Sequence, residues 1–141
     1  MEFKYYIITD LNLILECYIG EFKYKDIFES KMIEMSDPEW KNNYNVLADI
    51  RDSKFLISES EIKDLHKHYD LSVKRKSALL TNFPSHVVFG TFLKNYNIKE
   101  SLILPEVFST VEAALFWLDI NLEENERVKE ILNELSGNIN I

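Results

Sequence analysis

A strand that runs directly into an apolar helix, at residues 101–118, is the feature that most constrains the fold. The segment SLILPEVFSTVEAALFWL opens with a short apolar run and continues into a helix that carries apolar residues on most of its surface. Ser109 and Glu112 have the spacing of a capping box, in which each side chain binds the backbone N–H of the other residue. The segment therefore predicts one strand-to-helix unit of an α/β fold.

Similar alternations precede this unit. Residues 3–9 and 11–19 are rich in β-branched and aromatic residues, which predicts an opening hairpin whose second strand buries one face. Further strands are predicted at 44–50, 77–81 and 101–108, and helices at 24–35, from Ser58, after Pro84, at 109–118 and at 122–135.

This order predicts a single α/β domain with a five-stranded mixed sheet, built from an N-terminal hairpin and a β-α superhelix. Successive β-α-β crossovers place their helices mainly on one face of such a sheet. The other face needs a cover, and the C-terminal helix is the candidate. We expect residues 1–120 to form the α/β domain, and residues 121–141 to form an amphipathic helix and tail that either completes this domain or serves as an interface.

Composition narrows the class of protein. The chain has 141 residues, 46% of them hydrophobic, and a formal charge of -8. We expect no binding to nucleic acid, because phosphate contacts need clustered Lys and Arg. No run has the length and apolar character of a signal peptide or a membrane span, which favours a cytoplasmic protein. The single cysteine, Cys17, lies in an alternating apolar run and is expected to be a buried structural thiol.

Four features together resemble a known superfamily. They are the opening hairpin, the strand 46–50 with the polar loop after it, the strand 77–80, and the pattern VFSTVEAALFWL at 107–118. Over about residues 1–118, the chain resembles the STAS superfamily, in its bacterial branch of anti-sigma factor antagonists and STAS-like or CRAL-TRIO-related domains. The resemblance implies a β-α superhelical sheet and a mainly non-enzymatic module. Some members bind partner proteins under phosphorylation control, and others bind apolar ligands.

In the phospho-switched members, a strand ending in Asp precedes an Asp-Ser-Ser-Gly loop whose first serine accepts phosphate. Asp49 matches the acid of the strand, and Ser58 falls near the serine. Ile57, Glu59 and Ser60 stand where the other three motif residues would be. Because acidic neighbours repel a phosphate, Ser58 is expected chiefly to cap its helix.

Polar residues near the carboxyl ends of the strands predict where a ligand or partner binds, since open parallel sheets hold ligands at that edge. The candidates are Asp49, Arg51, Asp52, Ser53, Ser58, Asn82 and His86. A second prediction is an apolar pocket beside an aromatic-rich helix, although core packing explains the same residues; its walls would be Phe89, Phe92, Tyr96 and Trp117.

The leading hypothesis is a non-enzymatic cytoplasmic interaction or regulatory module that captures a protein partner through a surface including residues 49–60. The alternative is a protein that binds a small apolar or amphipathic ligand, and a hydrolase using His86 with a strand-end acid is a third reading. Homodimerisation stays open because the sheet has edges and the last helix is amphipathic. No cofactor or metal is expected: His66 and His68 are two residues apart and lack the i, i+4 spacing of a zinc helix.

Overall fold

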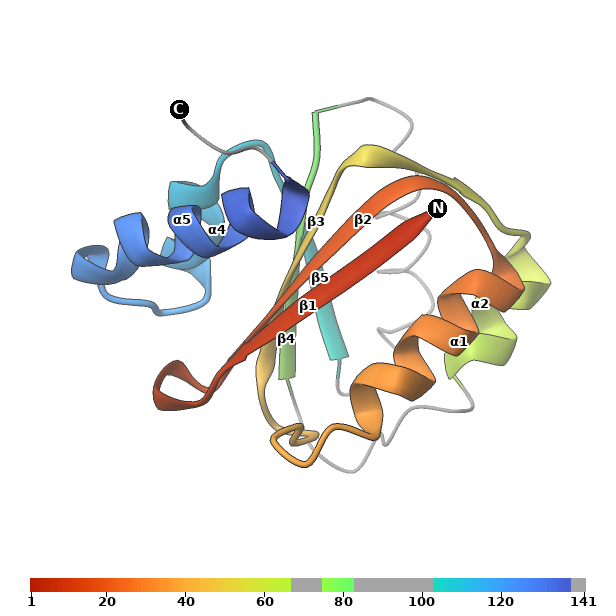
Figure 1. Cartoon of the computed structure of the whole chain (residues 1–141), viewed down its shortest axis with the longest axis horizontal. Helices are drawn as coiled ribbons and strands as arrows, with labels where there is room; N and C mark the ends of the chain where they lie inside the picture. Colours follow the sequence, from red (N-terminus) through yellow and green to blue (C-terminus); the bar gives the residue numbers. More distant parts are fainter. Residues whose placement is uncertain (67–74, 83–102, 138–141) are drawn as a thin grey trace.

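The computed structural model describes residues 1–66, 75–82 and 103–137. The predicted helix after Pro84 lies outside these residues. A five-stranded sheet with the order β1-β2-β3-β4-β5 forms the centre of the molecule (Figure 1). The strands are β1 (Glu2–Ile8), β2 (Leu13–Lys23), β3 (Asn45–Leu56), β4 (Arg75–Leu80) and β5 (Ile103–Phe108). The helices are α1 (Tyr24–Met35), α2 (Glu59–His66), α4 (Val111–Trp117) and α5 (Asn125–Ser136), with short 3-10 helices η1 (Thr9–Leu11) and η2 (Leu122–Glu124).

The opening hairpin is confirmed. β1 pairs antiparallel with β2, and the remaining neighbours pair parallel, so the sheet is mixed as predicted. The turn between β1 and β2 consists of η1 and Asn12, whose φ of 51° lies in the left-handed region that asparagine tolerates better than most residues.

Helices cover both faces of this sheet, with α1 and α2 on one side and α4 and α5 on the other (Figure 1). The crossover helices α1 and α2 share a face, as expected for successive β-α-β units. On the opposite face, α4 joins α5 as the cover, and Val128 and Leu132 of α5 are buried against Leu15 and Leu47 of the sheet.

β2 buries both of its faces, whereas the sequence predicted one. Leu13 and Leu15 pack in the cluster under α4 and α5, and Ile14 and Tyr18 pack in the cluster under α1. The reason is its place in the sheet: β2 lies between β1 and β3, and helices from both layers contact it. Period-2 alternation alone could not reveal the second helical layer.

β3 is longer than predicted. The polar residues 51–53 were expected to form a loop, but the strand continues to Leu56. One extra residue lies in β3 between the pairs Cys17↔Asp49 and Ile19↔Asp52, which makes a β-bulge, and pairing with β2 then resumes to the end of both strands. Backbone pairing with β2 and burial of Phe55 against Phe22, with ring centroids 5.7 Å apart, outweigh the local polarity.

The helix caps agree with the sequence in one case and differ in another. At α2 the capping box is present, with the Ser58 N–H 2.9 Å from Glu61 Oε1 and the Glu61 N–H 3.2 Å from Ser58 Oγ. At α4 the cap is Thr110 and not Ser109, because Thr110 Oγ1 accepts from the Ala113 N–H at 3.2 Å. The strand-to-helix turn is one residue longer than the capping-box pattern indicated.

Candidate functional site

Asp49 and Arg51 form a rigid pair on β3. Asp49 is 4% exposed, and its two carboxylate oxygens accept hydrogen bonds from Arg51 Nε at 3.0 Å and Nη2 at 2.8 Å. The backbone N–H of Arg51 donates to the same carboxylate at 3.1 Å. This contact raises the pKa of the Arg51 guanidinium, since the hydrogen bonds to Asp49 favour its charged form. The pair holds a partly exposed cation in a fixed orientation.

Arg51 lines a cleft of about 310 Å³ between β3, the start of α4 and the face of α5. Lys129 and Asn133 of α5 line the same cleft, together with Glu112 of α4. Leu132 forms part of the wall and is 1% exposed. The remaining lining residues are Ser109, Thr110 and Val111. Cationic, amide and hydroxyl groups therefore surround a space with an apolar side.

The β-bulge places Asp52 on the same side of the sheet as Asp49 and Arg51. Cys17 pairs with Asp49 and Ile19 pairs with Asp52, and because Cys17 and Ile19 point to the same face of β2, their partners share that face as well. In agreement, the charge of Asp52 acts on both Cys17 and Arg51. Burial, with Asp49 and Asp52 nearby, raises the pKa of the Cys17 thiol to about 12. Cys17 is 2% exposed, so the thiol is a structural one.

Three other predicted site residues lie elsewhere. Ser53 is buried, and its Oγ donates to the Ile50 carbonyl at 2.8 Å, next to the bulge. Ser58 is exposed and caps α2. Asn82 is exposed two residues beyond the end of β4. The structure thus groups Asp49, Arg51 and Asp52 but not Ser53, Ser58 or Asn82.

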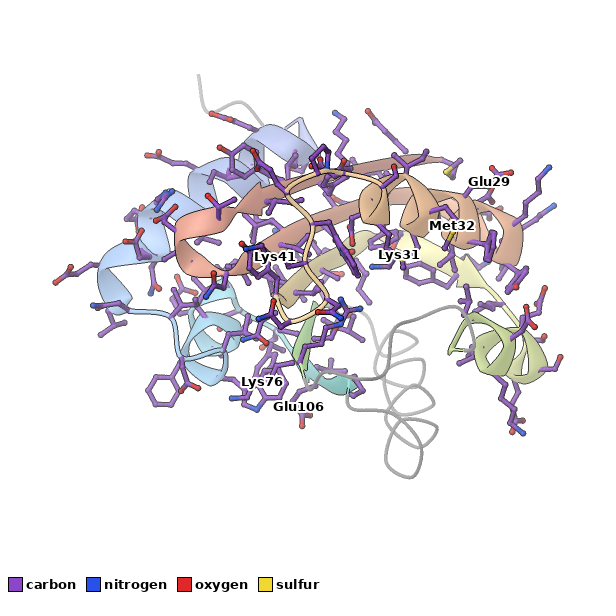
Figure 2. All side chains as sticks on the ribbon, turned by 90° about the horizontal axis from the view of Figure 1, so that it is seen from below. Glu29, Lys31, Met32, Lys41, Lys76 and Glu106 are labelled. Atoms are coloured by element: carbon purple, nitrogen blue, oxygen red, sulfur yellow. The ribbon has the colours of Figure 1, made fainter. Side chains whose placement is uncertain are left out.

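The predicted aromatic pocket falls largely outside the described residues. His86, Phe89, Phe92 and Tyr96 all belong to the range that the structure does not describe. Trp117 packs against Phe108, with ring centroids 5.4 Å apart, and the ammonium of Lys76 lies 5.0 Å from the centroid of the indole. Lys76, a residue of β4 that is labelled in Figure 2, also donates to the Trp117 carbonyl at 2.8 Å.

The sequence analysis missed a buried ionic cluster between α1 and the sheet. Lys31 of α1, which is labelled in Figure 2, forms an ion pair with Glu16 of β2, and its ammonium lies 3.7 Å from Glu34 Oε1. Glu16 and Glu34 are each 1% exposed, and Arg75 of β4 adds a second buried cation nearby. Glu16 also accepts a hydrogen bond from the Tyr18 hydroxyl at 3.1 Å. The available signal was a charged residue inside an otherwise apolar run, and it was assigned to the outer face of β2.

The two carboxyl groups of this cluster titrate in opposite directions. Burial and the negative charge of Glu16 raise the pKa of Glu34 well above its ordinary value. Burial also opposes ionisation of Glu16, but the charge of Lys31 and hydrogen bonds from Glu34 and Lys31 outweigh it and lower the pKa of Glu16. The cluster therefore favours a charged Glu16 paired with Lys31 and a neutral Glu34 beside it, and these contacts join α1 to β2.

The far halves of β2 and β3 form an extension that we call the β2–β3 arm, residues 19–23 and 52–56. On one face of this arm, Phe22 is buried and Phe55 packs into the aromatic cluster below α1. On the other face, the side chains are exposed or half-buried: Ile19, Glu21, Lys23, Asp52, Lys54 and Leu56. This face continues the sheet surface that α4 and α5 cover nearer the bulge.

Among the residues that the structure describes, no three His, Cys, Asp or Glu side chains are grouped so as to hold a metal ion. Within the same ranges, each helix is too short or too polar to cross a membrane.

Comparison with known proteins identifies the fold. No protein-family model matches the chain, and no curated protein matches it. A solved structure does match: an uncharacterized protein of the DUF3478 family from Shewanella loihica PV-4, described as having a SpoIIAA-like fold. The TM-score is 0.54 at 15% sequence identity, over 75% of this chain and 83% of that one. The chain therefore has the SpoIIAA-like, or STAS-like, fold, which confirms the resemblance at the level of the fold.

Proposed function

We propose that this protein is a non-enzymatic interaction or regulatory module that captures a protein partner through the exposed face of the β2–β3 arm. The observation that carries the proposal is the exposure of this face beyond the part of the sheet that α4 and α5 cover. The STAS-like fold supports it as well, because that fold is mainly associated with binding modules. Fold alone does not determine function, so the argument rests on the arm.

Exposure along the arm follows the alternation of a strand. On this face of β2, Leu15 and Cys17 are buried, at 0% and 2% exposed. Farther along the strand, Glu21 and Lys23 on the same face are exposed. On β3, the exposed residues Asp52 and Lys54 lead to Leu56, which is 41% exposed. An accessible apolar side chain at the end of a rigid strand is a typical anchor for a partner.

The charges of the arm favour a protein partner over a nucleic acid. Glu21 and Asp52 offset Lys23 and Lys54, so this face carries two charges of each sign and no basic patch. Alternating charges select a partner with a complementary pattern, while Leu56 contributes apolar area. The arm leads directly to Ser58 and α2, so a partner on the arm would also contact the segment that the STAS resemblance singles out.

The test is affinity capture from a lysate of the native host, with three baits. The wild-type chain is compared with the arm variant Lys54→Glu/Leu56→Ser and with the matched control Lys25→Glu/Leu122→Ser. Lys25 and Leu122 are exposed on α1 and η2, so the control makes the same chemical changes away from the arm. Circular dichroism verifies that all three fold.

A protein captured by the wild type and the control but lost with the arm variant supports the proposal. Equal capture by all three baits contradicts it, as does capture of nothing. Light scattering on the purified chains tests for a homodimer. If the wild type is a dimer and only the arm variant is a monomer, the partner is a second copy of the chain. We place this activity in the cytoplasm of a bacterium, which immunodetection in fractionated host cells tests.

A further inference from the structure

We propose that the cleft between β3, α4 and α5 binds a small organic monocarboxylate, with Arg51 and Lys129 as the groups that hold its carboxylate. This inference is independent of partner capture by the arm. It assigns a ligand chemistry to a cavity of about 310 Å³, which lies at the small end of the range of about 300–1,000 Å³ for small-molecule sites.

Arg51 is prepared for an anion. Asp49 occupies Nε and Nη2 of the guanidinium, and within the described part of the chain no hydrogen bond from Nη1 is formed. The side chain of Arg51 is 35% exposed and that of Asp49 is 5% exposed. The buried Asp49 carboxylate therefore fixes the guanidinium, while the edge that carries Nη1 stays accessible to a ligand. A ligand that binds this edge pays little to order the side chain.

Lys129 shows what the cleft accepts. Its ammonium forms an ion pair with the Glu112 carboxylate, which also lines the cleft, and lies 3.6 Å from Glu126 Oε1. Glu112 thus places a carboxylate of the protein itself where that of a ligand would bind. Because the Glu112 side chain is 49% exposed, it can move aside for a competitor. Glu112 is a built-in competitor of the ligand.

The charge of the surroundings selects a monoanion. Arg51 and Lys129 contribute two positive charges, and Asp49, Asp52, Glu112 and Glu126 contribute four negative charges. Because this group is already net negative, in a chain whose own charge is -8, a phosphate dianion is repelled more strongly than a monocarboxylate. Leu132 and Val111 on the wall, 1% and 8% exposed, provide apolar contact for a short alkyl chain.

The test is a titration of the ¹⁵N-labelled chain with sodium butyrate, followed by NMR at the amides of residues 109–112 and at the Arg51 side chain. Butyramide is the neutral control, and inorganic phosphate is the competing anion. Acetyl-Gly-Leu is tested with a free and with an amidated C-terminus, to show whether the cleft prefers the C-terminal carboxylate of a peptide to a free small acid. We expect saturable shifts with butyrate, none with butyramide, and weaker binding of phosphate and of both peptides.

Variants locate the site. Glu112→Gln removes the competitor and is expected to tighten butyrate binding severalfold. Arg51→Lys and Lys129→Gln are expected to weaken it about tenfold or more, the usual effect of losing a charge-assisted hydrogen bond. Lys25→Gln changes the net charge equally at a distant exposed site and is expected to have no effect.

Four results would overturn the proposal, and the first three concern the site and the choice of anion. They are no saturable shift even in Glu112→Gln, equal losses in Lys129→Gln and Lys25→Gln, and tighter binding of phosphate than of butyrate. If the peptide acid binds more tightly than butyrate, the free small acid is the wrong ligand. Arg51→Lys retains a cation beside buried Asp49, and its amide spectrum shows whether the fold is intact.

Discussion

The Lys31 ammonium of α1 lies against the buried carboxylate of Glu16 on β2, so one ion pair ties the first crossover helix to a central strand. Replacing Lys31 with Met leaves Glu16 without its closest cation, and we expect the free energy of unfolding to fall by about 3 kcal/mol or more. Urea denaturation measures this loss. Lys25→Met, at a side chain that is 83% exposed, is the control and should change stability by less than about 0.5 kcal/mol. Equal losses in the two variants would contradict the role of the cluster.

Glu34 makes stability depend on pH. Its pKa is raised in the folded state, so its stabilisation is fully present below the unfolded value of about 4.3 and is lost as the pH rises through the folded value. Glu16, Lys31, Arg75 and Tyr5 are the titratable and charged groups that act on Glu34 or titrate with it. Glu34→Gln cannot ionise, and its stability relative to the wild type should rise as the pH increases above about 5, until the pH passes the folded pKa of Glu34. A constant difference from pH 5 to pH 9 would show that Glu34 does not titrate there.

Cys17 should be inert in the native chain. With a pKa of about 12, the thiolate fraction at pH 8 is roughly a thousandfold below that of an unfolded cysteine, and burial blocks access as well. Reaction with Ellman's reagent at pH 8 is expected to be at least about a thousandfold slower in buffer than in 8 M urea. Rapid stoichiometric labelling of the native chain would disprove this burial.

The cap of α4 can be assigned by two alanine variants. Thr110→Ala removes the acceptor of the Ala113 N–H and should cost about 1 kcal/mol. Ser109→Ala should cost less than about 0.5 kcal/mol, because its side chain is exposed and takes no part in that cap. Denaturant unfolding of both variants measures these losses of stability. A larger loss in Ser109→Ala than in Thr110→Ala would show that Ser109 is the cap, as the sequence predicted.

Truncation after Ile120 tests the role of α5. The shortened chain loses Val128 and Leu132, which are 0% and 1% exposed, and we expect a monomer of strongly reduced stability. Leu132→Ala is the milder version and should cost about 3 kcal/mol. Calorimetry and light scattering measure both. A truncated chain that stays stable while a dimer dissociates would make α5 an interface.

The sequence predicted the order of elements well because each strand and helix carries its own pattern. The hairpin, α1 and the capping box of α2 depend on neighbours in the chain, which local patterns report. β3 was predicted to end near Ile50 because the bulge at residues 50–51 breaks the alternation, and a polar run then resembles a loop.

The candidate site was less predictable. Asp49, Arg51 and Asp52 were found because they are close in sequence, whereas Lys129 and Asn133 line the cleft from a helix that lies far from Arg51 in the sequence. No spacing rule connects residues that far apart. Glu16 was missed for a related reason, since its partner Lys31 comes from another element and a buried charge is recognisable only when such a partner is known.

The packing of α5 on β1 and β2 has a consequence for synthesis. Residues 2–56 contain the hairpin, α1 and the full length of β3, which can associate early as the chain leaves the ribosome. Leu13 and Leu15, by contrast, must wait for Val128 and Leu132, and Asp10 for the Arg127 that binds it across 117 positions. Until α5 emerges, one apolar surface of the nascent sheet faces water. Exposed apolar surface of this kind makes an incompletely folded chain prone to aggregation.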